Sequence, residues 1–195
     1  MTQQKDDARA RPSGRERVLN AAITCFSRSL YSEVSLRDLA AVADVDVAYV
    51  HRSYGSKSEL FKAALAELIR ADALFAQPFT RDEIIDRISA TLAPSRSGNH
   101  PQARVFDLVL RSCTSEEPKE ILREAVDQQF VGPLADVFGE GHKASASFCM
   151  SLMLGVGILR EVLVIEPIAS MSADQVRDVC REILHRILEN DLPAG

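Results

Sequence analysis

Residues 35–61 read SLRDLAAVADVDVAYVHRSYGSKSELF, and this stretch decides the fold. Ser35 and Asp38 have the spacing of a capping box, which predicts the start of a helix. That helix is short because Asp44 interrupts it, and Asp46 is a favourable N-cap for the next one. Gly55 predicts the end of this second short helix. Since such short helices are not stable alone, the two must pack on each other and on a neighbour.

The apolar residues of this stretch, and of the segment before it, recur at helical spacing. They are Val18, Leu19, Ala22, Ile23, Phe26 and Leu30, then Leu36, Leu39, Ala40, Ala43, Val45, Val50 and Tyr54. Three short helices with a tight turn between the last two are typical of a helix-turn-helix, whose final helix enters the major groove of DNA. The sequence therefore predicts a DNA-binding unit over residues 15–61.

The rest of the chain shows only helical periodicity, so the predicted fold class is all-α. Ser56 and Glu59 form a second capping box and open a fourth helix, which Pro78 stops near Gln77. Further helices are expected near 80–92, 101–114, 118–138, 142–165 and 173–190, with a kink at Gly132-Pro133 and a stop at Pro167. The predicted organisation is a disordered basic arm over 1–14, the DNA-binding domain over 15–61 and a helical domain over 62–195.

Composition and charge limit the possible functions. Hydrophobic residues make up 46% of the 195 residues and charged residues 26%, as in ordinary globular proteins. No stretch reaches the roughly 20 apolar residues that span a bilayer, and no apolar signal segment opens the chain, so we expect a cytoplasmic protein without membrane contact. Residues 1–62 hold 10 Lys and Arg against 8 Asp and Glu, a net charge of +2, and residues 63–195 hold 13 against 20, a net charge of −7. A basic head on an acidic body is compatible with DNA binding at one end.

The sequence lacks the motifs of common enzyme and metal sites. It has no phosphate loop, no nucleophile elbow and no cluster at metal-ligand spacing. Cys25, Cys113, Cys149 and Cys180 lie far apart in apolar helical stretches and are interpreted as small buried hydrophobes. We therefore expect no enzymatic activity, no cofactor and no metal.

Residues 35–61, above all the ending Tyr54-Gly-Ser-Lys-Ser-Glu-Leu-Phe61, resemble the signature of the TetR family of repressors. Residues 18–26 match the family's first helix, so this likeness covers about the first third of the chain. Residues 130–134 and 155–169 look like one subgroup of the family's ligand domains. The resemblance implies a dimeric repressor with an N-terminal helix-turn-helix and a C-terminal domain for ligand binding and dimerisation.

The resemblance also assigns DNA contacts. Ser35 and Lys57 lie where the family places phosphate contacts at helix N-termini, which bind anions through their amides. The full expected set is Ser35, Arg37, Val47, Ala48, Tyr49, His51, Arg52, Ser53 and Lys57.

Four residues depart from the usual pattern of the family: Asp44 replaces Gly, Asp46 replaces Ser or Thr, His51 replaces an aromatic residue and Ser53 replaces His. Asp44 tolerates the left-handed conformation of the turn, and Asp46 should still cap. Purely structural roles stay open: capping for Ser35, packing for Tyr49 and His51, and a solvated charge for Lys57.

The two last long helices are the expected dimer interface. The helix at 142–165 is apolar nearly all round and must be buried on several sides. Together with the stripe of the final helix, two copies would form a four-helix interface, as the resemblance also implies. The expected interface residues are Gly155, Val176, Val179, Cys180, Ile183, Leu184 and Ile187. The alternative is that this stripe belongs only to the core of its own chain.

The ligand pocket is expected between the fourth helix and those that follow, as in the family. Aromatic and methionine side chains suit a large apolar ligand, and an arginine can orient a polar group. The candidates are Leu74, Phe75, Phe106, Leu110, Arg111, Phe130, Met150 and Met153, although each can equally be ordinary core or an ion-pair partner. The predicted function is a repressor released from a pseudo-palindromic operator by a small lipophilic ligand. Alternatives are a DNA-binding regulator without such an inducer, and a helical enzyme.

Overall fold

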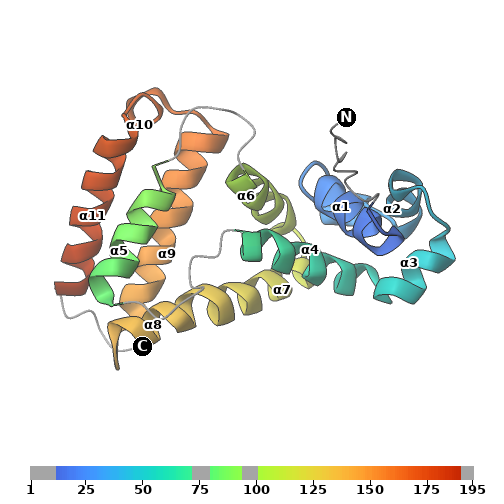
Figure 1. Cartoon of the computed structure of the whole chain (residues 1–195), viewed down its shortest axis with the longest axis horizontal. Helices are drawn as coiled ribbons and strands as arrows, with labels where there is room; N and C mark the ends of the chain where they lie inside the picture. The colour runs from blue at the N-terminus through green and yellow to red at the C-terminus, as the bar shows by residue number, and fades with distance from the viewer. Residues whose placement is uncertain (1–11, 72–79, 94–100, 190–195) are drawn as a thin grey trace, which may run out of the picture.

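The computed structural model describes residues 12–71, 80–93 and 101–189. Every regular element in these ranges is a helix, so the all-α prediction is confirmed for this part of the chain. The first elements are α1 (Gly14–Phe26), a 3₁₀ turn η1 (Tyr31–Glu33), α2 (Leu36–Ala43), α3 (Val47–Tyr54) and α4 (Lys57–Ala71). Figure 1 shows α1, α2 and α3 gathered at one end of an elongated molecule, with α4 running from them toward the other end.

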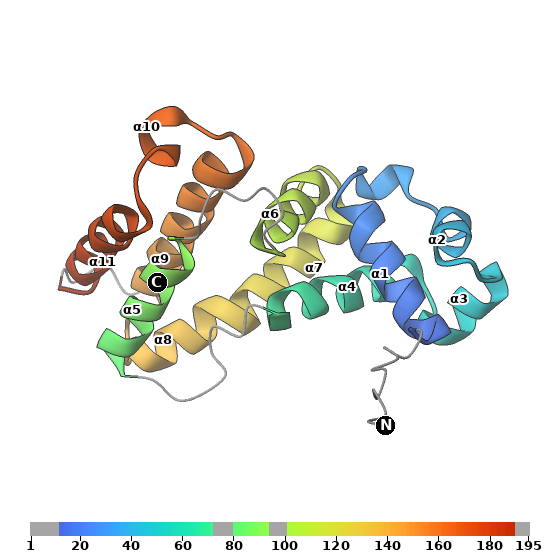
Figure 2. The same cartoon turned by 45° about the horizontal axis from the view of Figure 1, so that its top comes forward.

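The remaining helices build the body of the molecule. They are α5 (Arg81–Thr91), α6 (Pro101–Ser112), α7 (Glu116–Val126), α8 (Gly132–Phe138), α9 (Lys143–Gly157), α10 (Glu166–Ala169) and α11 (Ala173–Glu189). A π-helical turn, η2 (Asp127–Val131), joins α7 to α8, and a second one, η3 (Ile158–Val162), extends α9. Figure 2 shows α7 and α8 as one long rod that runs diagonally across the molecule, and α6 between the DNA-binding end and the α5–α9–α11 group.

Proline positions explain two local features. Where a kink was expected at Gly132-Pro133, the structure has the π turn η2, which precedes Pro133. Proline has no N–H and its ring clashes with the carbonyl one turn earlier, so a widened turn accommodates it within a continuous helix. Pro167 does not stop the long helix as expected. That helix ends near Leu163, and Val164 follows at φ 50°, a strained conformation for a β-branched residue, while Pro167 lies in the first turn of α10.

The helix-turn-helix is formed as the capping signals predict. Ser35 caps α2 through the Asp38 amide, and the Asp38 carboxylate accepts a hydrogen bond from the Ser35 amide at 2.9 Å. Asp44 adopts the left-handed conformation at φ 52°, which confirms that it serves in place of the usual glycine. Asp46 occupies the N-cap position of α3, but its side chain makes no capping hydrogen bond, so that part of the expectation is wrong.

Buried side chains form two cores. The first combines α1–α3 with the inner faces of α4, α6 and α7, and the second lies among α5, α8, α9 and α11. Leu65, Leu68, Leu108, Ile121 and Leu122 all belong to the first core although they lie beyond residue 61. The predicted domain boundary at 61/62 stays a prediction, since packing continues across it.

The structure also bears on two further interpretations of the sequence. Cys149 and Cys180 are buried, but Cys113 is exposed at the C-terminal end of α6, so it is not the buried hydrophobe expected. Residues 143–162 form a helix that is long and apolar enough to cross a membrane by composition alone. Its Cys149, Met150 and Met153 side chains are buried in the second core, which accounts for its apolar character.

Candidate nucleic-acid interface and apolar pocket

The exposed side of α3 holds three of the expected DNA contacts. Ala48, His51 and Arg52 are exposed, whereas Val50 is fully buried and holds the helix on the first core. Among the other expected contacts, Ser35 and Arg37 are exposed at the start of α2, and Val47, Tyr49 and Ser53 are partly buried. α2 and α3 therefore present a mixed polar surface at the free end of the molecule.

Both tyrosines of α3 fasten it to the start of α1. A methyl group at Gly14 would overlap the hydroxyl end of the Tyr49 ring, so Gly14 leaves the space that this ring needs. Tyr54 donates a hydrogen bond to the Arg15 carbonyl at 3.0 Å, and the Arg15 guanidinium lies over the Tyr54 ring at 4.6 Å from its centre. Tyr49 thus has a packing role, and it is partly buried against the first core.

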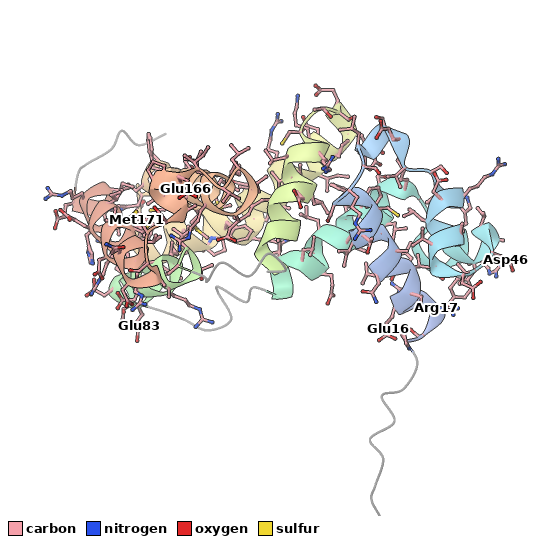
Figure 3. The ribbon with its side chains drawn as sticks, turned by 90° about the horizontal axis from the view of Figure 1, so that it is seen from above. Glu16, Arg17, Asp46, Glu83, Glu166 and Met171 are labelled. Atoms are coloured by element: carbon pink, nitrogen blue, oxygen red, sulfur yellow. The ribbon has the colours of Figure 1, made fainter. Side chains whose placement is uncertain are left out.

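Two arginines from α1 lie against the helix-turn-helix. Arg15 donates to the Ser53 carbonyl at the end of α3, and Arg17 reaches the Asp44 carbonyl in the turn at 3.4 Å. Figure 3 shows Arg17 and Asp46 at the same end of the molecule. Both guanidinium groups thereby bring positive charge to the end of the molecule that holds the helix-turn-helix.

His51 has a defined hydrogen-bonding geometry. Its Nδ1 lies 3.0 Å from the Gly55 carbonyl oxygen. A carbonyl only accepts, so Nδ1 must carry the hydrogen, and Nε2 is the ring nitrogen left for another partner. In the neutral ring Nε2 is an acceptor, and only the protonated ring can donate from it to a phosphate oxygen.

Lys57 is partly buried and bound to backbone carbonyls. Its ammonium donates to the carbonyls of Tyr31 and Val34 at 2.8 and 2.9 Å, and it lies 4.1 Å from the centre of the Tyr31 ring. Burial lowers the pKa of Lys57 below its ordinary value, and the Glu117 carboxylate partly opposes that effect. The side chain thereby joins the start of α4 to the loop before α2, and its contact with a phosphate stays a prediction.

A cavity of about 80 Å³ lies at the seam between the two cores. Its lining is almost wholly apolar and comes from α4, α5, α6, α7, α9 and both π turns. π turns are often found at functional sites, and here both contribute side chains to one cavity. The lining residues are Leu65, Ile69, Thr91, Leu92, Val105, Phe106, Val109, Leu122, Ala125, Val126, Phe130, Met150, Met153, Leu154, Gly157, Arg160 and Glu161.

The predicted pocket residues divide into three groups. Phe106, Phe130, Met150 and Met153 line the cavity. Leu110 and Arg111 do not, because both are exposed on α6, and Arg111 donates from Nε to the Ser27 carbonyl at 3.1 Å. Leu74 and Phe75 fall outside the described residues. The branched side chains Val105, Val109 and Leu122 were missed, because periodicity alone does not separate a cavity wall from solid core.

The polar end of the cavity is formed by neighbours in η3. Arg160 is buried and donates to the carbonyls of Ile168 and Met171, at 3.1 Å each, so it fastens the loop around α10. The Glu161 carboxylate lines the cavity, is about 14% exposed, and lies 3.8 Å from the Arg160 Nε. That distance is long for a hydrogen bond, so Glu161 keeps capacity to accept from another donor.

The predicted dimer residues also separate in the structure. Val176, Cys180 and Leu184 are buried in the second core of their own chain, so they are unsuited to direct intersubunit contact. Val179 and Ile183 are 48% and 38% exposed on the other side of α11, and Ile187 and Gly155 are partly buried. On α9 and η3, Phe148 and Leu159 are exposed as well, at 57% and 41%. The sequence did not predict these two, because an all-round apolar helix gives no sign of which side is left uncovered.

Two family models match the chain. A model described as bacterial regulatory proteins of the tetR family covers residues 18–64, and one described as the tetracyclin repressor-like C-terminal domain covers residues 82–188. The chain belongs to the TetR family of transcriptional regulators. The fold and the helix-turn-helix predicted from the sequence are those of a TetR-family DNA-binding regulator. No curated protein sequence is similar enough to count as a relative.

Solved structures show the same fold. A TetR-family regulator from Streptomyces coelicolor is 26% identical, with 93% of this chain and 99% of that chain covered and a TM-score of 0.56. NalD of Pseudomonas aeruginosa, the secondary repressor of a multidrug efflux pump, is 18% identical, with 89% and 96% covered and a TM-score of 0.65. The multidrug binding protein EbrR, solved with malachite green, is 19% identical, with 90% and 98% covered and a TM-score of 0.61. In the described part of this TetR-family chain, no three potential metal ligands cluster.

Proposed function

We propose that this regulator is a cytoplasmic repressor that binds a pseudo-palindromic operator as a homodimer and leaves it when a small lipophilic molecule enters the seam cavity. The observation that carries the proposal is the position of that cavity. Some of the side chains that line the cavity belong to the first core, which includes the helix-turn-helix. Others belong to the second core, which includes the inner sides of α9 and α11. A molecule bound there contacts both.

Dimerisation through α9 and α11 is supported by their exposed apolar side chains. α9 and α11 pack against each other, and Phe148, Leu159, Val179 and Ile183 are exposed on them. Burying these side chains against a second copy would stabilise the assembly by roughly 25 cal/mol per Å² of apolar surface removed from water. A closed two-fold dimer also suits DNA, because one short recognition helix contacts few base pairs.

The cavity lining indicates the chemistry of the effector. Apolar side chains surround it, so the body of the effector is apolar or aromatic. At its polar end, Arg160 is engaged with backbone carbonyls while Glu161 retains acceptor capacity. A donor such as an amine or an N–H group on the effector would therefore pair with Glu161. Binding of malachite green by EbrR is compatible with an aromatic effector class for this fold.

The first experiment tests DNA binding and release together. Purified protein selects sequences from random duplex DNA, and the enriched site is expected to be an inverted repeat bound by a dimer. The probe for release is N-phenyl-1-naphthylamine, an apolar aromatic amine whose fluorescence rises in apolar surroundings. We expect it to bind and to weaken operator affinity, typically by 5- to 150-fold for coupled sites.

A matched pair of variants tests whether release from the operator depends on the cavity. Ala125→Leu fills the cavity from α7 and should abolish probe binding while leaving operator binding intact, because α7 lies apart from α3 (Figure 1). Ala90→Leu adds the same side chain on the exposed side of α5 and should behave as wild type. A wild-type protein that binds the inverted repeat equally well with and without bound probe would favour the alternative, a regulator without this kind of inducer. Failure to enrich any inverted repeat would contradict the proposed function itself.

A further inference from the structure

The seam cavity is smaller than any effector that the fold is expected to bind. Ligand pockets of proteins usually measure about 300–1,000 Å³, and even a cavity that holds benzene measures about 150 Å³. The volume of about 80 Å³ found here is below both values. Something must therefore leave the cavity, or its walls must move, before an effector fits.

Phe106 is the side chain that fills the missing space. Its ring comes from α6 and points across the cavity at Gly157, the last residue of α9. A methyl group at Gly157 would overlap three atoms at the tip of this ring, and all three are carbons. By contrast, the neighbouring Gly155 has open space where its methyl group would lie. Gly157 thus creates a slot that fits an aromatic ring, and the protein's own ring fills it.

The helix that carries Phe106 also contacts the DNA-binding end. α6 packs against α1 and α4 on one side and against α9 and η3 on the other, and both views show it between the two groups. Five residues after Phe106, the Arg111 Nε donates to the Ser27 carbonyl at the C-terminal cap of α1. Because α6 is a continuous helix of 12 residues, a push on Phe106 is transmitted to this contact.

We propose that Phe106 is a built-in occupant of the effector site, and that an aromatic effector replaces its ring beside Gly157 and thereby displaces α6. The displaced α6 shifts the Arg111–Ser27 contact, moves α1 and changes the placement of α3. The inference rests on the proposed function, since it specifies how binding in the seam cavity reaches the DNA-binding end. It also makes an aromatic ring the part of the effector that triggers release.

A glycine substitution tests the proposal without any effector. Gly157→Ala should push the Phe106 ring as an effector does, so operator affinity should fall at least fivefold in the absence of probe, within the usual range of coupling. The control is the double variant described next, which carries the same methyl group with space around it. Circular dichroism and sedimentation establish that both variants are folded and equally dimeric.

The double variant Gly157→Ala/Phe106→Ala makes the test specific. Removing the ring gives the new methyl group its space, so operator affinity should return to within about twofold of wild type. An equal loss of affinity in the single and double variants would overturn the proposal, as would a folded Gly157→Ala protein with wild-type affinity. Phe106→Ala alone covers the case in which Gly157→Ala does not fold. It should bind N-phenyl-1-naphthylamine more tightly than wild type and yet release the operator less than twofold, because the probe takes the vacated slot without moving α6.

The outcomes also distinguish this inference from the proposed function. Release of wild type by the probe supports the proposed function whatever the variants do. Undiminished release of Phe106→Ala by bound probe would overturn the inference alone. Loss of affinity in Gly157→Ala with recovery in the double variant supports the inference even when this particular probe does not release wild type.

Discussion

Replacing Lys57 with methionine separates a structural role from a DNA contact. Methionine keeps an unbranched apolar side chain of similar length but removes the ammonium that donates to the Tyr31 and Val34 carbonyls. Hydrogen bonds from charged groups contribute about 1.5–3 kcal/mol each. The cation–π contact with Tyr31 adds about 0.5–1 kcal/mol at a partly exposed site. The freed carbonyls regain some water, so we expect a net loss of about 2–3 kcal/mol in the free energy of unfolding.

That loss has a clear signature in thermal unfolding. For a chain of this length 1 kcal/mol corresponds to about 2–4 °C, so Lys57→Met should lower Tm by about 4–12 °C. Lys62→Met is the control, because Lys62 makes only an exposed ion pair with Glu59, which contributes about 0–1 kcal/mol. The assay is calorimetry at one protein concentration, combined with operator affinity at several salt concentrations.

The two roles predict opposite patterns. A phosphate contact would leave Tm unchanged and lower the salt slope of DNA binding by about one. The structure predicts the reverse for Lys57→Met: a large fall in Tm and an unchanged slope for the folded fraction. An unaltered Tm, equal to that of Lys62→Met, would refute the reasoning from the hydrogen bonds.

Three further predictions concern a DNA contact, thiols and assembly. Since His51 is exposed and its Nδ1 lies 3.0 Å from the Gly55 carbonyl, Nε2 is left for a phosphate, so His51→Phe should weaken operator binding; unchanged affinity would exclude this contact. Cys113 is exposed and should react quickly with a thiol reagent at neutral pH, whereas burial raises the pKa of Cys149 to about 12 and should delay its reaction until unfolding, as timed mass spectrometry would show. Val179→Glu with Ile183→Glu should yield monomers by sedimentation and abolish operator binding, since both side chains are exposed on α11; an intact dimer would contradict the assignment of this face.

The helix-turn-helix could be predicted almost completely from local signals in the sequence. Capping residues act within one turn of chain, so Ser35 and the left-handed Asp44 could be located from their neighbours alone. The role of the Asp46 side chain was harder to predict, because Asp46 stands at the N-cap of α3 without making a capping hydrogen bond. The structural role of Lys57 was missed because its partners, the carbonyls of residues 31 and 34, lie in a loop whose path depends on the tertiary fold.

The body of the protein was less predictable for a related reason. Periodicity showed that α11 has an apolar stripe, but not that Val176 and Leu184 face its own core while Ile183 faces outward. Likewise, Leu110 and Phe106 differ by one helical turn and share a side of α6, yet only Phe106 reaches the cavity. The first distinction depends on how a helix is rotated relative to its neighbours and the second on where along its length it meets them, and a single sequence carries little information about either.

The continuity of the first core has a consequence for protein engineering. Biosensors are often assembled by grafting the operator-binding module of one regulator onto the sensing module of another, and residue 61 looks like a natural splice point. Here such a graft would sever Leu60 and Phe61 from Leu65, Leu108 and Leu122, which belong to the same core. It would also separate Tyr31 and Ser27 from their partners Glu117 and Arg111. A working chimera of this scaffold would have to transplant the matching surfaces of α4, α6 and α7 along with the recognition unit, or redesign them as one interface.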